Sequence, residues 1–115
     1  MSSILDVFQE HYPKLMRALP MNDDYFIAEL YARKLLPGNL KADIESLPTS
    51  AKRATKFLDD VIKPSVENNN CTKFHTLLRL MKENDDGTIR QLADRIRNLL
   101  NETIRSVLNQ KIGKH

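Results

Sequence analysis

The chain has 115 residues, of which 41% are hydrophobic and 29% are charged, and its formal net charge is +3. These values are typical of a single globular domain that is long enough to bury a core. An excess of three positive charges is too small to indicate nucleic-acid binding by itself.

The cysteine usage and the hydropathy of the chain exclude several classes of protein. A single cysteine, Cys71, rules out an internal disulfide framework and fits a reducing compartment, so we expect a cytoplasmic location. No apolar run approaches the roughly 18 residues of a membrane span. The first 14 residues mix acids with apolar residues and lack a basic leader, so they do not indicate a signal peptide.

Apolar residues at helical spacing predict a first helix over residues 3–19, with Pro13 inside it. Because a proline removes one backbone hydrogen bond, we expect a kink there, or a break with a second short helix starting at the proline. A second helix is predicted over residues 22–36. Asn22 or Asp23 is its expected N-cap, and a Pro-Gly pair ends it.

A short third helix is predicted over residues 39–47, with Asn39 as its N-cap. The fourth helix occupies residues 49–62, between two prolines. Its N-cap is Thr49 or Ser50, because either hydroxyl can accept a hydrogen bond from the first turn. The proline that follows is expected to close this helix.

After the polar stretch "SVENNN", which predicts a loop, a fifth helix is expected over residues 72–83. The last helix starts after Thr88 as N-cap, and its apolar face continues through Leu108 to Ile112. That length predicts either a helix that packs back over the first one or a helix that projects toward a coiled coil or a further domain. No stretch alternates with period two for long enough to form a strand, so we predict an all-α bundle of six amphipathic helices.

The fourth helix is charged against its own dipole. Lys52, Arg53 and Lys56 lie near its positive N-terminal end, whereas Asp59 and Asp60 lie near its negative end, and each such placement costs roughly 0.3–1 kcal/mol. The three basic residues lie opposite the apolar face, so we expect them to be clustered and solvent-facing. A solvated face, with a local pair between Lys56 and Asp60, is the simpler alternative to a surface that binds acids.

Four stretches together resemble the caspase recruitment domain (CARD), a branch of the death-fold superfamily. They are a leucine-rich helix ending in a turn, "LYARKLLPGNL"; a short helix ending "DIESLPT"; a small and basic, then apolar and acidic helix, "SAKRATKFLDDVI"; and a Phe before a leucine pair, "KFHTLLRLM". The match spans residues 4–100. It predicts a CARD-like domain over residues 1–100 and an extension of the last helix over residues 101–115. Death-effector and pyrin domains share this helical pattern.

The resemblance implies an antiparallel six-helix Greek-key bundle with a kinked first helix and no catalytic residues. It also implies contacts with other CARD-containing proteins and with itself, in which a basic surface of helices one and four docks on an acidic surface of helices two and three. Repetition of this contact builds oligomers or filaments that gather signalling proteins in apoptosis or innate immunity. Carried over to this chain, the basic surface comprises Arg17, Lys52, Arg53 and Lys56, and the acidic surface comprises Asp23, Asp24, Asp43 and Glu45.

Other functions have weaker support in the sequence. Cys71 and His75 stand four residues apart, as metal ligands can, but a site needs three or four ligands. With no Gly-rich phosphate loop and no paired carboxylates, we predict no enzyme activity, cofactor or small-molecule substrate. The alternative function is a small helical nucleic-acid-binding domain that uses "SAKRATK" or the arginines after Thr88 on the phosphate backbone. Interspersed acids argue against a continuous basic footprint. A helical scaffold without assembly is a third possibility.

Overall fold

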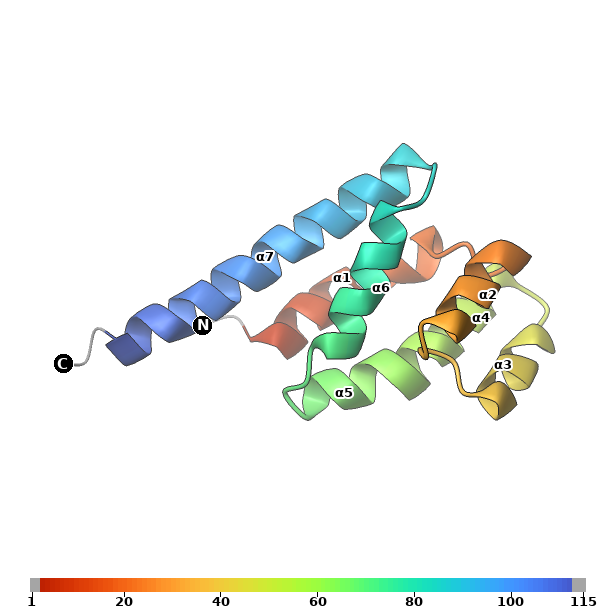
Figure 1. Ribbon diagram of the computed structural model, residues 1–115, viewed down its shortest axis with the longest axis horizontal. Coiled ribbons are helices and arrows are strands. Elements are labelled where there is room, and N and C mark those ends of the chain that lie inside the picture. The colour runs from red at the N-terminus through yellow and green to blue at the C-terminus, as the bar shows by residue number, and fades with distance from the viewer. Residues whose placement is uncertain (1–2, 113–115) are drawn as a thin grey trace.

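The computed structural model of the chain describes residues 3–112, and for Val107 and residues 109–112 it describes the backbone alone. This part of the chain is helical and contains no strand. The elements are α1 (Ile4–Ala18), α2 (Asp24–Ala32), α3 (Gly38–Glu45), α4 (Ser50–Phe57), the π-helical turn η1 (Leu58–Ile62), α5 (Lys63–Glu67), α6 (Thr72–Lys82) and α7 (Gly87–Ile112) (Figure 1). Because α4, η1 and α5 follow one another without interruption, the described residues form six continuous helices. The predicted all-α class is confirmed, and the Greek-key order stays a prediction.

Helix α1 is continuous through Pro13. Its start is held by a capping box, in which Ser3 Oγ accepts from the Asp6 N–H at 3.1 Å and Asp6 Oδ2 accepts from the Ser3 N–H at 3.0 Å. The predicted break at Pro13 is therefore wrong. Pro13 and Gln9, whose carbonyl loses its helical partner, both lie on the exposed face, so water can replace the missing bond. The predicted kink stays a prediction.

Helix α2 begins as predicted, because the Asp23 side chain caps it. It ends earlier than predicted, since Lys34 adopts a left-handed conformation with φ of 64°. The N–H of Lys34 bonds to the carbonyl of Tyr31 at 3.0 Å, and the N–H of Leu35 bonds to the carbonyl of Leu30 at 2.9 Å. This is the Schellman arrangement, and it turns Leu35 into the core from a loop.

Three further N-caps were predicted, and one of them is confirmed. Thr49 caps α4 by accepting from a backbone N–H of the first turn at 3.1 Å. Asn39 does not cap α3, which begins after Pro37 and has no side-chain cap. Thr88 does not cap α7. Instead the Asp86 carboxylate accepts from the Thr88 N–H at 2.8 Å, so the helix begins before Thr88.

The helix that starts with α4 runs on through Pro64 to the end of α5, so the predicted closure before Pro64 is wrong. The predicted loop over residues 65–70 is wrong for residues 65–67, which are helical, and confirmed for residues 68–70. The reason that the helix continues lies in η1, where the N–H of Lys63 bonds to the carbonyl of Leu58, five residues back. This wider turn shifts the hydrogen-bond ladder directly before Pro64, so the helix can pass a residue that has no N–H to donate. Val66 then carries α5 into the core.

Asp59 and Asp60 consequently lie in the middle of a continuous helix instead of at its negative end. The unfavourable dipole placement that was expected for them does not arise. The Tyr12 hydroxyl donates to Asp59 Oδ1 at 2.8 Å, which ties α1 to η1. Burial, and then this hydrogen bond, raises the pKa of Tyr12.

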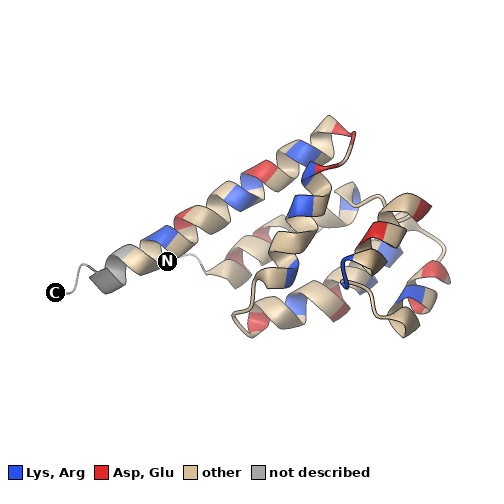
Figure 2. Cartoon of the chain, viewed as in Figure 1, with Lys and Arg blue, Asp and Glu red and all other residues tan. Residues whose placement is uncertain are grey.

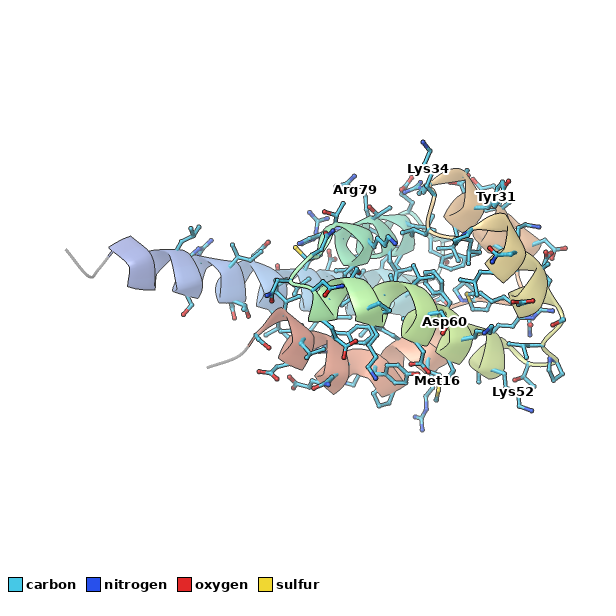
Figure 3. All side chains as sticks on the ribbon, turned by 90° about the horizontal axis from the view of Figure 1, so that it is seen from below. Met16, Tyr31, Lys34, Lys52, Asp60 and Arg79 are labelled. Atoms are coloured by element: carbon cyan, nitrogen blue, oxygen red, sulfur yellow. The ribbon has the colours of Figure 1, made fainter. Side chains whose placement is uncertain are left out.

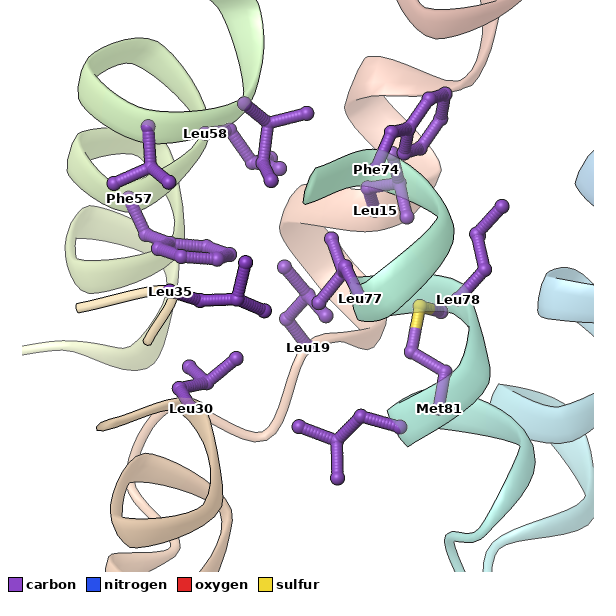
Figure 4. Close-up of a cluster of buried hydrophobic side chains, with 14 of the residues drawn as sticks. Leu15, Leu19, Leu30, Leu35, Phe57, Leu58, Phe74, Leu77, Leu78 and Met81 are labelled. Atoms are coloured by element: carbon purple, nitrogen blue, oxygen red, sulfur yellow. The ribbon is translucent and has the colours of Figure 1, made fainter. Parts of the chain in front are cut away.

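Every helix contributes apolar side chains to one core, so the predicted apolar faces are confirmed as far as Leu100 of α7. Figure 4 shows the part of this core that α1, α2, α4, η1 and α6 form. Phe8 of α1 and Phe74 of α6 meet edge to face with ring centroids 5.5 Å apart. Burying each large apolar side chain stabilises the fold by about 1.5–3 kcal/mol. The least exposed of them include Leu15, Leu19, Leu30, Ile44, Phe57, Leu58, Leu77, Leu78 and Met81.

Helix α7 has 26 residues, packs against α1 and α6, and extends beyond the bundle at its C-terminal end (Figure 1). Leu100 is fully buried and Thr103 is 9% exposed, whereas Leu108 is 53% exposed. The first part of α7 therefore packs over α1, as one expectation had it, and the last part projects. A coiled coil or a further domain stays a prediction, and the side chains of residues 107 and 112, which were part of the expected apolar face, lie outside the described ones. Among the described helices, none combines the length and the apolar character needed to cross a membrane.

Candidate interaction surfaces

The Arg53 side chain is half-buried and fixes the fold locally, which corrects the expectation that it faces solvent. Its guanidinium donates three hydrogen bonds to backbone carbonyls: Nε to Leu47 at 3.0 Å, Nη1 to Met21 at 3.0 Å and Nη2 to Glu45 at 2.9 Å. Met21 belongs to the α1–α2 connection, and the other two acceptors lie at the α3–α4 connection. Arg53 therefore holds two connections against the first turn of α4, because a planar guanidinium presents several fixed donors.

Ser50 reinforces the same junction. Its Oγ accepts from the Met21 N–H at 3.0 Å and donates to the Leu19 carbonyl at 3.1 Å. The predicted alternative of Ser50 as N-cap is thus replaced by a contact with the α1–α2 connection. The first turn of α4 therefore holds the neighbouring connections in place through Ser50 and Arg53, in addition to carrying surface charge.

The other two basic residues of α4 differ in how available their charge is. Lys56 Nζ lies 2.9 Å from Asp60 Oδ2, which confirms the predicted local pair, and this hydrogen bond raises the pKa of Lys56. Lys52 is exposed, and within residues 3–112 no carboxylate pairs with it. Figure 3 shows its side chain pointing away from the bundle. Within the described residues, Lys52 is the one member of the predicted α4 cluster whose charged group forms neither an ion pair nor a hydrogen bond.

Arg17 lies in a basic depression between α1 and α7, with a volume of about 320 Å³. Lys14 and Arg95 also line it, and Ala18 and Leu92 supply apolar surface. The three cationic side chains are exposed, and none of them forms an ion pair with a described carboxylate. We call this site the basic depression. It extends the predicted basic surface from α1 toward α7.

The four acids predicted for the acidic surface also differ. Asp23 accepts from the Tyr25 N–H at 2.9 Å as the cap of α2, and Glu45 Oε1 accepts from Lys41 Nζ at 2.9 Å. Asp24 and Asp43 are exposed and pair with no cation among the described residues. The negative charge of this surface is therefore carried chiefly by α2 and by Asp43.

A second depression, of about 330 Å³, lies between α2 and α6 and has acidic walls. Asp23, Glu29 and Glu83 line it around Arg33, whose Nη2 lies 2.7 Å from Glu83 Oε2 and whose Nε lies 3.3 Å from Glu29 Oε2. The hydrogen bond from Arg33 lowers the pKa of Glu83. We call this site the acidic depression. The Tyr25 side chain at its wall is 72% exposed.

Sequence reasoning did not assign Arg95, Glu29 or Glu83 to either surface. Figure 2 shows why, because both signs of charge occur on most helices and no single segment stands out. Arg95 reaches Arg17 only because α7 packs against α1, and Glu83 reaches Glu29 only through Arg33. Nothing in the local spacing of these residues indicates such neighbours.

In the described part of the chain, no group of three or more His, Cys, Asp or Glu side chains is placed to hold a metal ion. Comparison of the chain with known proteins finds no matching family model, curated protein or solved structure. The resemblance to the CARD therefore rests on the sequence pattern, and membership of that family stays a prediction.

Proposed function

We propose that this chain is a non-catalytic interaction module of the CARD type, which assembles with itself and with other CARD-containing proteins in the cytoplasm. One observation carries the proposal: unpaired cations lie on different elements of this small domain from a surplus of acids, which consists of the unpaired Asp24 and of three carboxylates around the single Arg33. Lys52 and the basic depression present positive charge from α4, α1 and α7, whereas Asp24 and the acidic depression present negative charge from α2 and α6.

Two complementary surfaces on one chain support a heterologous contact, in which the basic side of one copy meets the acidic side of the next. Such a contact leaves one surface of each kind unoccupied at the ends, so it propagates into rings or filaments. In the proposed role, these assemblies gather signalling proteins in apoptosis or innate immunity. Because the contact is between exposed charges, its strength falls as salt screens them.

The test is sedimentation velocity of the purified chain at increasing concentration, in low and in high salt. We expect oligomers at low salt that dissociate at high salt. Lys52→Glu reverses a charge without touching a described partner, and we expect it to lower the association constant about tenfold, or about 1.4 kcal/mol. Lys73→Glu, an exposed residue of α6 outside both surfaces, is the matched control. A chain that stays monomeric at every concentration in low salt contradicts the proposal.

Nucleic-acid binding is the second candidate, and the basic depression favours it. Lys14, Arg17 and Arg95 line one concave site that no carboxylate lines, which suits a phosphate. Fluorescence anisotropy with a labelled single-stranded and a labelled duplex oligonucleotide tests this candidate. Binding that falls steeply with salt and is lost in Arg17→Glu/Arg95→Glu supports it, and no binding at low salt removes it.

A further inference from the structure

We propose that the basic depression of one copy receives the Tyr25 side chain of a second copy. The inference rests on the proposed self-assembly and names one contact within it. This contact adds to the one expected from the sequence, because its receiving surface is built by α1 and α7, whereas Lys52 presents its charge from α4.

The basic depression has the composition of a receptacle for an aromatic side chain with acidic neighbours. Its volume of about 320 Å³ lies at the lower end of the range, about 300–1,000 Å³, in which protein pockets hold ligands. Ala18 and Leu92 offer apolar surface, and Leu92 is 8% exposed, so its position is fixed by the core. Lys14, Arg17 and Arg95 surround that surface with positive charge.

Tyr25 has the complementary composition. At 72% it is the most exposed of the large hydrophobic side chains described, although it belongs to the first turn of a well-capped helix. Asp24 precedes it, and the carboxylate of Asp23 is held beside it by the 2.9 Å hydrogen bond from the Tyr25 N–H. An exposed aromatic ring is thus presented at the start of α2, next to the fixed carboxylate of Asp23 and the exposed Asp24.

Each group around Tyr25 has a possible partner in the basic depression. A tyrosine ring can pack on apolar surface while Arg17 or Arg95 lies over its face, which is a favourable cation–π arrangement. The carboxylates beside the ring can pair with the remaining cations in charge-assisted hydrogen bonds. Tyrosine and arginine are the residue types that most often dominate the energy of protein interfaces.

The other exposed tyrosine of α2 lacks this complementarity. Tyr31 is 52% exposed, but Lys41 Nζ lies 6.0 Å from its ring centroid, and Lys34 lines the same surface hollow. Lys34 is unpaired among the described residues and Lys41 is paired with Glu45, so the surroundings of Tyr31 complement a basic depression less well than the acids beside Tyr25 do. Charge therefore selects Tyr25 over Tyr31 as the inserted side chain.

The test uses two variants that each lose one side of the contact. Tyr25→Ala removes the inserted ring, and Arg17→Glu/Arg95→Glu reverses the charge of the depression. All three residues are exposed, so the circular dichroism spectra of both variants should match that of the unaltered chain. We expect each variant alone to associate at least tenfold more weakly than the unaltered chain in sedimentation velocity at low salt. Arg95→Gln is a milder second variant, should the double reversal perturb the fold. Tyr31→Ala and Arg105→Glu are the matched controls and should associate normally.

A mixture of the two variants gives the decisive result. The Tyr25→Ala variant retains the basic depression, and the Arg17→Glu/Arg95→Glu variant retains Tyr25. An equimolar mixture should therefore form a 1:1 complex that does not grow beyond two chains. Normal association of both variants overturns this contact and leaves the proposed self-assembly standing. No complex in the mixture likewise overturns it. An unaltered chain that never associates overturns the self-assembly itself, and the inference with it.

Discussion

The guanidinium of Arg53 joins three segments of the chain, because its donors reach carbonyls in two connections while its backbone belongs to α4. Hydrogen bonds from a charged donor contribute more than neutral ones, at about 1.5–3 kcal/mol. The same side chain was expected to bind a partner, and that role stays a prediction. Its contribution to stability follows directly from the contacts.

Replacing Arg53 by Ala should therefore lower the free energy of unfolding by about 2–3 kcal/mol, because three carbonyls lose their donor. Arg53→Lys should recover only part of this, since one ammonium group cannot reproduce the spacing of the guanidinium donors. Urea denaturation of both variants measures the effect. Lys52→Ala is the control at the neighbouring exposed position, and equal losses for Lys52 and Arg53 would contradict the assignment.

Acid should destabilise the chain through His75. Burial lowers the pKa of His75 below 6.5, and Arg97 and Arg79 lower it further. The unfolded chain therefore binds a proton at this site before the folded chain does. The free energy of unfolding that His75 contributes is fully present above pH 6.5, and it is lost as the pH falls from 6.5 through the lowered pKa of the folded chain. Urea denaturation at pH 7.5, 6.5 and 5.5 should show a smaller loss for His75→Gln than for the unaltered chain, and identical losses would contradict this.

At the scale of elements, two helices end next to a residue whose backbone is left-handed. Lys34 and Asn69 close α2 and α5 with φ of 64° and 58°. Asparagine is common in such positions, whereas lysine carries a steric cost of about 1–2 kcal/mol. Lys34 is exposed, so this cost can be relieved without disturbing the core.

We expect Lys34→Gly to raise the free energy of unfolding by about 0.5–1 kcal/mol, because glycine removes the strain but loses more entropy on folding. Lys34→Ala keeps the Cβ atom that strains the left-handed backbone and removes the charge, so it should not raise the free energy of unfolding. Thermal and urea denaturation of both variants provide the comparison. Stabilisation by alanine as great as by glycine would show that the charge, and not the backbone, is responsible.

For the whole molecule, the main question is how much of α7 belongs to the bundle. Burial extends to Thr103 and leaves Leu108 exposed, so the packed part of the helix reaches beyond the predicted boundary at residue 100. That boundary and the extension over residues 101–115 stay predictions, and truncation addresses them.

A chain truncated after residue 105 should unfold at nearly the same urea concentration as the full chain, because Thr103 and the half-buried Ile104 are retained. Truncation after residue 100 removes both and should cost about 1–3 kcal/mol. Equal stability of the two truncated chains would place the boundary at residue 100 after all. A large loss in the longer one would place residues 106–115 within the folded unit.

The sequence alone determined the helical class and the apolar faces that pack in the core, because these depend on neighbours within about four residues. It narrowed two caps to Asn22 or Asp23 and to Thr49 or Ser50, and the structure selected Asp23 and Thr49. Tertiary structure decided which charges are used inside the fold and which reach the surface. Arg53 finds its acceptors in two connections, Arg95 meets Arg17 across α1 and α7, and η1 carries the helix past Pro64. Such pairings join residues far apart in the chain, and no local spacing encodes them.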